Sequence, residues 1–495
     1  MKHARASTRS SARTAVLAAV ATLLVGLPVL ATARLAGAGA PVSDGGDLQA
    51  PVRPRPRQTA PGFQAPIATV CSDAPRMREV PDPQPSAQDI AAPDTRTRRA
   101  AGGPPMAPPP MPSPAALAAK AVVPSRVAHL DHAAPVAPVA PVAPVPPPQR
   151  TQGPVTAGVV DDNADFAGFR QFLQRHPEAA GLGRDLSVRQ RLRVVDAQGR
   201  PVPDAEVTVS AANGARLWAR TDAGGQAWLH LNAFDDQDSA QYRVVVRRDG
   251  RQAQAQLRRG QKAALEMRLP VAPPAGAARL DLVFLVDATG SMGDEIDKLR
   301  ASLQDIVRGI GQLPARPDVC LGLVAYRDRG DDFFVRSWDL TGNTAAFQQV
   351  LDGVRAGGGG DMPEAMNEAF AHAVQALAWR GPATTRLLVS LADAPPHMDY
   401  PRPHYDQTML AALGKGIKVF SVAASGQDTT GEIVQRQIAQ YTGGRFIFLT
   451  YKDAADPGSG PGRETVHDVA NYSVDTLDEL VVRLVREELA QLPQG

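Results

Sequence analysis

One apolar run, Leu280-Asp-Leu-Val-Phe-Leu-Val286, constrains the fold more than any other feature of this 495-residue chain. An apolar run of this length without alternation predicts a strand that is buried on both faces. Such strands belong mostly to parallel sheets with helices on each side. The run therefore predicts the first strand of an α/β domain.

The chain after residue 279 alternates strand-like and helix-like segments. Apolar runs predict strands over 280–286, 319–326, 333–340, 385–391, 418–423 and 445–449. Helical periodicity covers 294–310, 345–354, 363–379, 406–413, 432–441 and 474–492. Such an alternation favours an α/β fold with a doubly wound, mostly parallel sheet. We expect this domain to span residues 279–492.

The N-terminal part of the chain has a different composition. Residues 41–150 hold 26 of the 45 prolines and a single aromatic residue, Phe63, so they cannot bury a core. The triplet Ala-Pro-Val occurs four times from Ala134 to Val145, which matches the three residues per turn of polyproline II. We predict a disordered Pro/Ala-rich linker over 34–155, either a stiff arm or a spacer without a selected length.

The first residues resemble a targeting signal. A basic start precedes the uncharged, Ala- and Leu-rich stretch from Thr14 to Ala33. This pattern predicts a signal peptide over 1–33, or an uncleaved signal anchor that would be the only membrane contact. In either case we expect the rest of the chain outside the cytoplasm, in the periplasm, on the cell surface or secreted.

Charge and cysteine content add two expectations. The formal net charge is only +2, so no global field favours binding to nucleic acid. The two cysteines are Cys71 and Cys320. Because Cys320 lies in an apolar run, we interpret it as a buried, inert thiol, while a disulfide to Cys71 stays open.

Short strands and turns precede the α/β domain. We expect a helical lead-in over 156–186, a small all-β sandwich over 187–270 and a linker over 271–278. The turn at Asp249-Gly250 separates two alternating strands, as in a β-hairpin. Basic residues crowd this region, and we favour a solvated face over a polyanion-binding patch: Arg243, Arg247, Arg248, Arg251, Arg258, Arg259 and Lys262. The run from Val195 to Val207, followed by Thr221-Asp-Ala-Gly-Gly225, resembles the carboxypeptidase-regulatory-like, transthyretin-like modules, which implies a non-catalytic stalk or partner-binding unit.

Three predicted loops carry oxygen ligands at the carboxyl ends of the strands. They are Asp287-Ala-Thr289-Gly-Ser291, the Gly-rich loop that ends in Asp361, and the strand end at Asp393. In sheets of this type ligands bind at that edge. Carboxylates and hydroxyls without His or Cys form a site for a hard divalent cation, with Mg²⁺ first and Mn²⁺ or Ca²⁺ as alternatives.

This constellation resembles the metal-ion-dependent adhesion site of von Willebrand factor type A (VWA) domains. The resemblance implies that Thr289 and Ser291 coordinate the metal directly, whereas Asp287 and Asp393 act mostly through water, and that a ligand carboxylate completes the shell. The loop sequences at 358–365 and 392–397 look like A-type modules of bacterial exported proteins and of some alpha-kinases. Integrin-type domains have Thr where this chain has Asp361, which weakens the expectation of acid capture but not of metal binding.

Other interpretations exist for single residues. Asp361 with Glu364 matches a capping box for a helix that enters at Pro363. Downstream, His397, Asp399 and His404 are expected at the rim of the site, where they could touch the ligand. Together with Asp406 they could instead hold a second metal, although the spacing is not helical.

The leading functional hypothesis is an exported, non-catalytic protein that binds a divalent cation and, through it, a protein or glycan partner, in adhesion or scaffolding. One alternative is a metal-dependent hydrolase, but the sequence has no recognisable nucleophile–base pair. Another is a structural envelope component whose metal only stabilises the fold.

Overall fold

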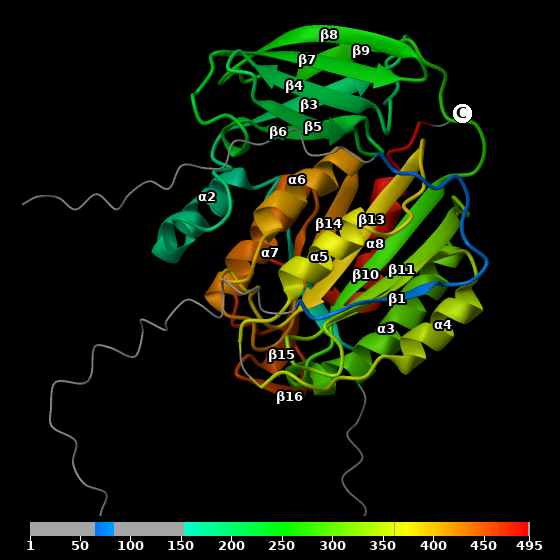
Figure 1. The fold of residues 1–495 in the computed structure, drawn as a ribbon, viewed down its shortest axis with the longest axis vertical. Coiled ribbons are helices and arrows are strands. Elements are labelled where there is room, and N and C mark those ends of the chain that lie inside the picture. The colour runs from blue at the N-terminus through cyan, green and yellow to red at the C-terminus, as the bar shows by residue number, and fades with distance from the viewer. Residues whose placement is uncertain (1–64, 84–152, 361, 494–495) are drawn as a thin grey trace, which may run out of the picture. The chain divides into compact units, whose positions relative to one another are not determined.

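The structure, a computed structural model, describes residues 65–83, 153–360 and 362–493 (Figure 1). The predicted signal segment lies outside these residues, as do most of the predicted linker and the predicted ligand Asp361. The described part is a mixed α/β protein with a sandwich-like β region. No helix in the described ranges is both long and apolar enough to cross a membrane.

The larger sheet has ten strands, in the order β1-β12-β11-β10-β13-β14-β15-β2-β17, and β16 pairs with β15. The central strands β11, β10, β13, β14 and β15 run parallel to one another. The strands towards the two margins pair antiparallel with their neighbours: β1 with β12, β12 with β11, β2 with β15 and β17 with β2. The bounds are β10 Arg279–Asp287, β11 Asp318–Tyr326, β12 Val335–Thr341, β13 Thr384–Ala392, β14 Ile417–Ala423, β15 Phe446–Asp453, β16 Asp456–Pro461 and β17 Val474–Thr476.

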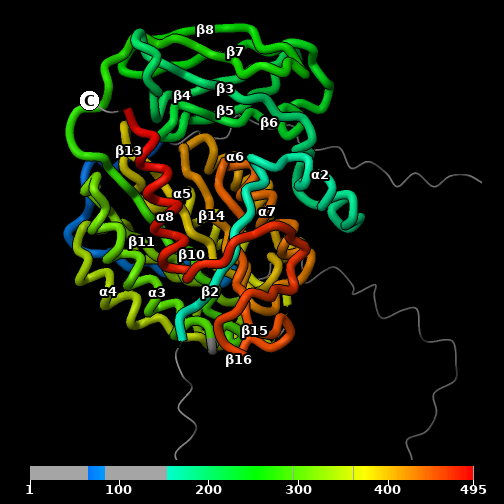
Figure 2. Tube along the Cα trace, turned by 180° about the vertical axis from the view of Figure 1, so that it is seen from behind, coloured from blue at the N-terminus to red at the C-terminus, as the bar shows by residue number. Residues whose placement is uncertain are grey.

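Helices cover both faces of this sheet, which explains why its central strands are apolar throughout. Successive residues of β10 enter different cores, with Phe284 in one and Leu285 in the other. Helices of the described chain pack on both faces, three on the Phe284 face and three on the Leu285 face. The two opposite views show helices on both sides of the sheet (Figures 1 and 2). The first three are α3 Gly293–Gly311, α4 Thr344–Gly353 and α8 Leu477–Leu489; the others are α5 Met366–Gln375, α6 Tyr405–Lys415 and α7 Thr429–Thr442.

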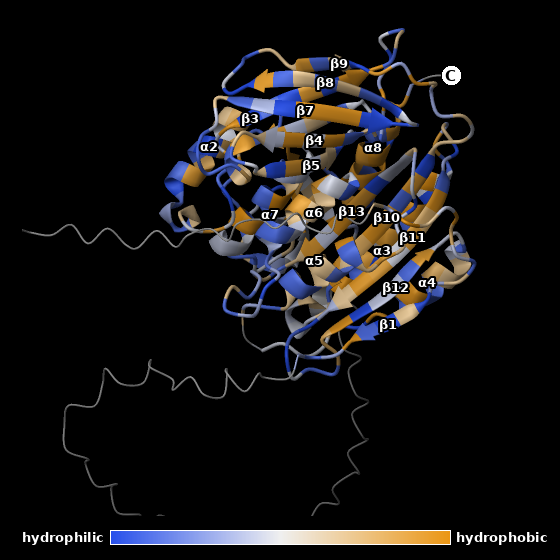
Figure 3. Cartoon of the chain, turned by 45° about the horizontal axis from the view of Figure 1, so that its top comes forward, coloured by the Kyte–Doolittle hydropathy of each residue, from blue (hydrophilic) through white to orange (hydrophobic). Residues whose placement is uncertain are grey.

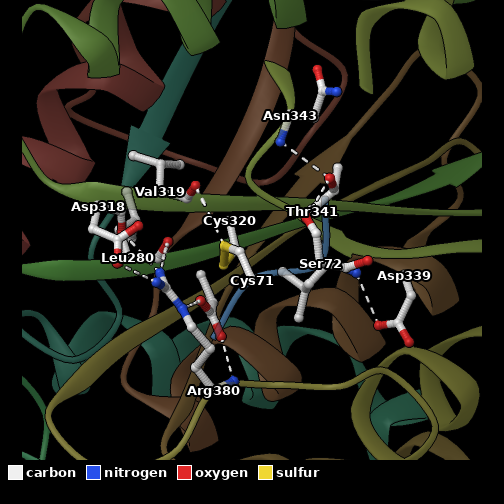
Figure 4. Close-up of a disulfide and its surroundings, with 12 residues drawn as sticks. Cys71, Ser72, Leu280, Asp318, Val319, Cys320, Asp339, Thr341, Asn343 and Arg380 are labelled. Atoms are coloured by element: carbon white, nitrogen blue, oxygen red, sulfur yellow. Dashed lines mark hydrogen bonds and ion pairs between the residues drawn. A yellow bond between two sulfur atoms is a disulfide. The ribbon is translucent and has the colours of Figure 1, made fainter. Parts of the chain in front are cut away.

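A segment that the sequence assigned to the linker contributes an edge strand. Strand β1 (Met77–Val80) pairs antiparallel with β12. Just before it, Cys71 forms a disulfide with Cys320 of β11, with their Cα atoms 5.8 Å apart (Figure 4). The carbonyl of Ser72 accepts hydrogen bonds from the Thr341 hydroxyl and the Gly342 amide. The interpretation of Cys320 as an inert thiol is therefore wrong.

The predicted helical lead-in also begins with a strand. Strand β2 (Thr156–Val160) pairs antiparallel with β15, at the margin of the sheet opposite β1. The helix α2 (Phe166–Arg175) and the short 3₁₀ helix η3 (Pro177–Ala179) follow it. The α/β domain thus includes two strands that precede the β-sandwich in the sequence, in addition to the strands that follow it.

The β-sandwich consists of two sheets, β6-β3-β9 and β5-β4-β7-β8. Inward residues such as Leu192, Val207 and Val244 form its core, and a hairpin at Asp249-Gly250 joins β7 to β8 as predicted. The bounds are β3 Arg189–Val195, β4 Glu206–Ala211, β5 Arg216–Arg220, β6 Gln226–His230, β7 Gln241–Arg248, β8 Arg251–Arg258 and β9 Leu265–Arg268.

Buried ion pairs join the β-sandwich to the amino ends of the α/β strands. Asp204, in the turn before β4, accepts from the Arg386 guanidinium of β13 at 2.9 Å. Lys418 of β14 pairs with Asp222 at 3.3 Å and with Glu488 of α8 at 2.6 Å. Among the described residues, no such ion pair joins the β-sandwich to the carboxyl ends of these strands.

Candidate metal centre

Two buried carboxylates lie at the carboxyl ends of neighbouring strands. Asp287 is the last residue of β10 and Asp393 directly follows β13. The two residues are 0% and 1% exposed. One oxygen of each carboxylate, Asp287 Oδ2 and Asp393 Oδ1, has no hydrogen-bond partner within the described part of the chain. A buried acceptor without a partner is unusual and requires an explanation.

Two hydroxyls connect to these carboxylates. The Thr289 amide and hydroxyl both donate to Asp287 Oδ1, at 3.0 and 2.7 Å. The Thr289 and Ser291 hydroxyl oxygens are 3.0 Å apart, and the Ser291 hydroxyl lies beside Asp393, whose pKa it lowers against the larger effect of burial. Four of the five predicted metal ligands therefore form one connected group of oxygens.

The Gly-rich loop lies directly against the first loop. The Gly290 amide donates to the Gly358 carbonyl at 3.0 Å. Gly359 has a φ of 65°, and a Cβ there would lie 3.0 Å from the Cβ of Thr289, so only glycine suits this approach. The loop that leads to Asp361 thus borders the oxygen group, while Asp361 itself lies outside the described residues.

The electrostatics of the site are those of an acidic cluster without counter-charge. Burial and the adjacent Asp393 raise the pKa of Asp287 to about 7. Burial also raises the pKa of Asp393. No Lys or Arg in the described ranges forms an ion pair with either carboxylate. A cation would offset this repulsion, because nearby positive charge favours the ionised carboxylate. The oxygen donors and their charge fit a hard divalent cation.

Glu364 belongs to this cluster, although the sequence indicated a helix cap. Helix α5 begins at Met366 with Ala365 as its N-cap, and no side chain caps it. Glu364 is buried, and its Oε2 atom has no partner. Burial and then Asp287 and other carboxylates raise the pKa of Glu364 to about 9. Its spacing of three residues from Asp361 matched a capping box, so no sequence signal distinguished the two roles.

Glu295 of α3 is a second acidic residue that the sequence analysis missed. Its Oε1 atom accepts from the Tyr451 hydroxyl at 2.5 Å and from the Ser425 amide at 3.2 Å. Burial raises the pKa of Glu295, and the charge of Asp393 adds to the shift. Glu295 thus links the metal centre to the ends of β14 and β15.

The three predicted rim residues have distinct positions. His397 lies between Asp328, at 3.2 Å, and Asp399, at 3.0 Å. Burial lowers the pKa of His397, but hydrogen bonds to these two carboxylates, together with their charge, raise it above the ordinary value. Its ring stacks on Tyr400 at 3.6 Å. His404 instead forms the N-cap of α6 and contacts the Tyr400 carbonyl.

The second metal site that was considered for these residues is not assembled. Within the described ranges, no group of three or more His, Cys, Asp or Glu side chains is gathered as a metal site would require. His397 uses both ring nitrogens on carboxylates. The oxygen group around Asp287 consists in part of hydroxyls, which such a group of acids, histidines and cysteines does not include.

The two domains of the chain match known domain families. The chain contains a von Willebrand factor A domain, because that family matches residues 281–402, a range that includes all three loops. The carboxypeptidase regulatory-like domain family matches residues 191–270, which is the β-sandwich. Both domain types that the sequence predicted are confirmed.

The chain is similar to individual relatives over a part of its length and spans only a small part of theirs. The alpha-protein kinase vwkA of Dictyostelium discoideum is 30% identical over 123 residues, which cover 24% of this chain and 19% of the kinase. An ariadne-like RING finger protein of Acanthamoeba polyphaga mimivirus is 33% identical over 120 residues, or 24% of this chain and 11% of that protein. Among solved structures, the pilus adhesin SpaC from Lactobacillus rhamnosus GG has 14% identity and a TM-score of 0.26, with 41% of this chain and 29% of the adhesin covered.

Proposed function

We propose that this protein is a non-catalytic binding protein whose A domain holds a divalent cation, Mg²⁺ first, and through it a protein or glycan partner. One observation carries the proposal. Two buried carboxylates, Asp287 and Asp393, each have an oxygen without a partner and share their surroundings with two hydroxyls. A cation bound there would supply the positive charge that the cluster lacks and would present an open coordination position to an acidic group.

The roles of the residues are those that the resemblance to VWA domains implies. Thr289 and Ser291, whose hydroxyl oxygens are 3.0 Å apart, would be direct ligands. Asp287 and Asp393, both buried, would act through water and by charge. Asp361 would add a carboxylate from the Gly-rich loop. We therefore propose a metal-ion-dependent adhesion site on a doubly wound sheet, with a more acidic ligand set than a Thr at position 361 would give.

An extracytoplasmic location fits this role. The Cys71–Cys320 disulfide is of a kind that persists in oxidising compartments. The basic and apolar N-terminal segment would direct export. We propose the periplasm, the cell surface or secretion, and adhesion or scaffolding as the task.

The described part of the chain contains a nucleophile–base pair that the sequence analysis missed, but its surroundings favour a structural role. The Ser337 hydroxyl and His372 Nε2 are 2.8 Å apart. Ser337 is 0% exposed, in a strand that β1 covers along its edge. The nearby Asp339 is engaged by Arg78 at 2.7 Å and by the Ala378 amide at 2.8 Å. Because the Ser337 hydroxyl is buried, a substrate would not reach it, which supports the proposal of a non-catalytic protein.

Calorimetry with Mg²⁺ tests the cation site. Wild type should bind one ion, whereas Ser291→Ala should bind it at least about tenfold more weakly, because a direct ligand is lost. Ser239→Ala, in a β-sandwich loop, is the matched control and should bind like wild type. Equal binding by Ser291→Ala and wild type would refute the assignment. A pull-down from envelope extracts with and without chelator then tests whether the partner depends on the cation.

A further inference from the structure

The outer face of the β5-β4-β7-β8 sheet contains a second pocket, far in sequence from the metal centre. It has a volume of about 300 Å³, at the lower end of the range for small-ligand sites. Its polar lining comes from β4, β5 and β7, and consists of Thr208, Ser210, Arg216, Trp218, Arg243 and Arg247. We call these six residues the sandwich pocket. The sequence analysis favoured a solvated face here.

Strand geometry explains why these side chains meet. Alternate residues of β4 point inward, and Thr208 and Ser210 point outward between them. In the ladder Thr208 faces Trp218 on one side, while Ser210 faces Arg216 and Arg243 on its two sides. Directly opposed side chains are neighbours in space. The register therefore places an indole ring and two guanidinium groups around a hydroxyl-lined floor, on a sheet face whose strands β7 and β8 carry many polar residues (Figure 3).

The charge of the sandwich pocket is positive and largely uncompensated. Arg216 and Arg243 are exposed, and neither forms an ion pair with an acidic side chain of the described residues. Arg247 donates to the amide of Gln252 at 2.8 Å. The carboxylate on the same face, Glu206, already pairs with Arg220 at 2.7 Å. The two free guanidinium groups are therefore available to a ligand.

We propose that the sandwich pocket binds a carboxylated polysaccharide. The planar guanidinium fork of arginine matches a carboxylate with two parallel hydrogen bonds. Trp218, half-buried and flanked by polar groups, offers a flat apolar surface on which a sugar ring can stack. Neutral donors and acceptors, Thr208, Ser210 and the exposed Gln254 and Gln256 of β8, suit hydroxyl groups.

The same features disfavour a nucleic acid. Single-stranded nucleic acids are bound by several aromatic side chains that stack successive bases along a basic groove. The sandwich pocket has one aromatic residue, Trp218, and two free arginines. Its hydroxyl groups and the neighbouring amides of Gln254 and Gln256 match a polyhydroxylated chain with one charge per ring better than a chain of phosphates.

The test measures binding of the full chain to polygalacturonate at physiological salt and in EDTA, so that the metal centre cannot contribute. Dextran, heparin and single-stranded DNA serve as neutral, sulfated and nucleic-acid comparisons. We expect polygalacturonate to bind most tightly. Trp218→Ala and the double variant Arg216→Gln/Arg243→Gln should each weaken this binding about tenfold.

The matched control is Arg191→Gln/Arg193→Gln, which removes the same charge from exposed positions of β3 in the opposite sheet. It should bind polygalacturonate like wild type, and thermal unfolding of every variant checks its fold. Equal weakening by both double variants, or no effect of Trp218→Ala in a folded protein, would overturn the proposal. Tighter binding of heparin or single-stranded DNA than of polygalacturonate would overturn it as well. Since the assay excludes the cation, it can fail while the metal-site proposal stands.

Discussion

The two ends of the parallel strands treat buried charge in opposite ways. Near the amino end of β10, Asp281 is fully buried, and both of its oxygens accept from Arg380 at 2.6 Å. At the carboxyl end of the same strand, Asp287 is equally buried but faces Asp393 and Glu364 rather than a cation. The buried acid at the amino end has a counter-charge within the chain, whereas the buried acid at the carboxyl end has none among the described residues.

This difference in charge pairing supports the proposed position of the cation site. A buried acid costs free energy unless it is paired. The amino-end acids, Asp281 and Asp204, obtain their partners from Arg380 and Arg386. The carboxyl-end acids obtain none from the described residues. The acids without a counter-charge are the ones on which the proposed cation site rests.

The largest expected effect on stability comes from removing the buried Asp281–Arg380 ion pair at the amino end of β10. Asp281→Asn leaves Arg380 buried without its main counter-charge, and we expect a loss of about 3–5 kcal/mol in the free energy of unfolding. Denaturant unfolding measures it. The control is Asp318→Asn, which removes a second, half-exposed partner of Arg380 and should cost less than about 1 kcal/mol. Similar losses in both variants would contradict the comparison.

A pH-dependent effect of intermediate size is expected at the sandwich side. Burial lowers the pKa of His230 to about 3, and its ring stacks on Tyr441 of α7. The folded state therefore binds fewer protons than the unfolded state between about pH 3 and 6.5, so His230 should lower stability as pH falls through this window. Between pH 6.5 and 5 the loss is about 2 kcal/mol. Urea unfolding of wild type and His230→Phe should differ in pH slope by that amount; parallel slopes would argue against the buried neutral imidazole.

A smaller effect, an increase in stability, is expected when the charge of Asp287 is removed at the carboxyl end of β10. Asp287→Asn removes one charge from the acidic cluster, and in EDTA at pH 8 it should stabilise the protein by about 1–2 kcal/mol. The same substitution should abolish the stabilisation that Mg²⁺ gives to wild type. Thermal unfolding with EDTA and with Mg²⁺ measures both. A destabilised variant in EDTA would mean that the charge of Asp287 is compensated without a cation.

The smallest effect is expected for an exposed pair. Glu79 of β1 accepts from Arg336 of β12 at 3.0 Å, with both side chains partly exposed. Water and salt screen such a pair, so Glu79→Gln should change the free energy of unfolding by less than about 0.5 kcal/mol. Denaturant unfolding at low and high salt checks this value. A loss as large as that of Asp281→Asn would remove the distinction between buried and exposed pairs.

The sequence predicted the parts of the fold that depend on local pattern. The run at 280–286 predicted β10 to within one residue at each end. The two domain types were recognisable because their motifs lie within single loops and strands. Four predicted metal ligands, Asp287, Thr289, Ser291 and Asp393, meet because the parallel order of β10 and β13 brings their ends together.

The missed features depend on contacts between distant segments. Strand β1 lies among prolines and has exposed side chains, so only its backbone pairing with β12 defines it. Cys71 and Cys320 are 249 residues apart, and their sequence surroundings did not indicate a bond. Glu364 matched a helix cap, and its role near Asp287 follows from the path of the Gly-rich loop.

The disulfide and β1 also determine how the chain can transmit mechanical force. Residues 71–80 are fastened to one margin of the large sheet, and β2 is fastened to the opposite margin. A pull applied upstream of Cys71 would therefore enter the fold at β11, through the covalent bond to Cys320, and would spare the pairing of β1 with β12.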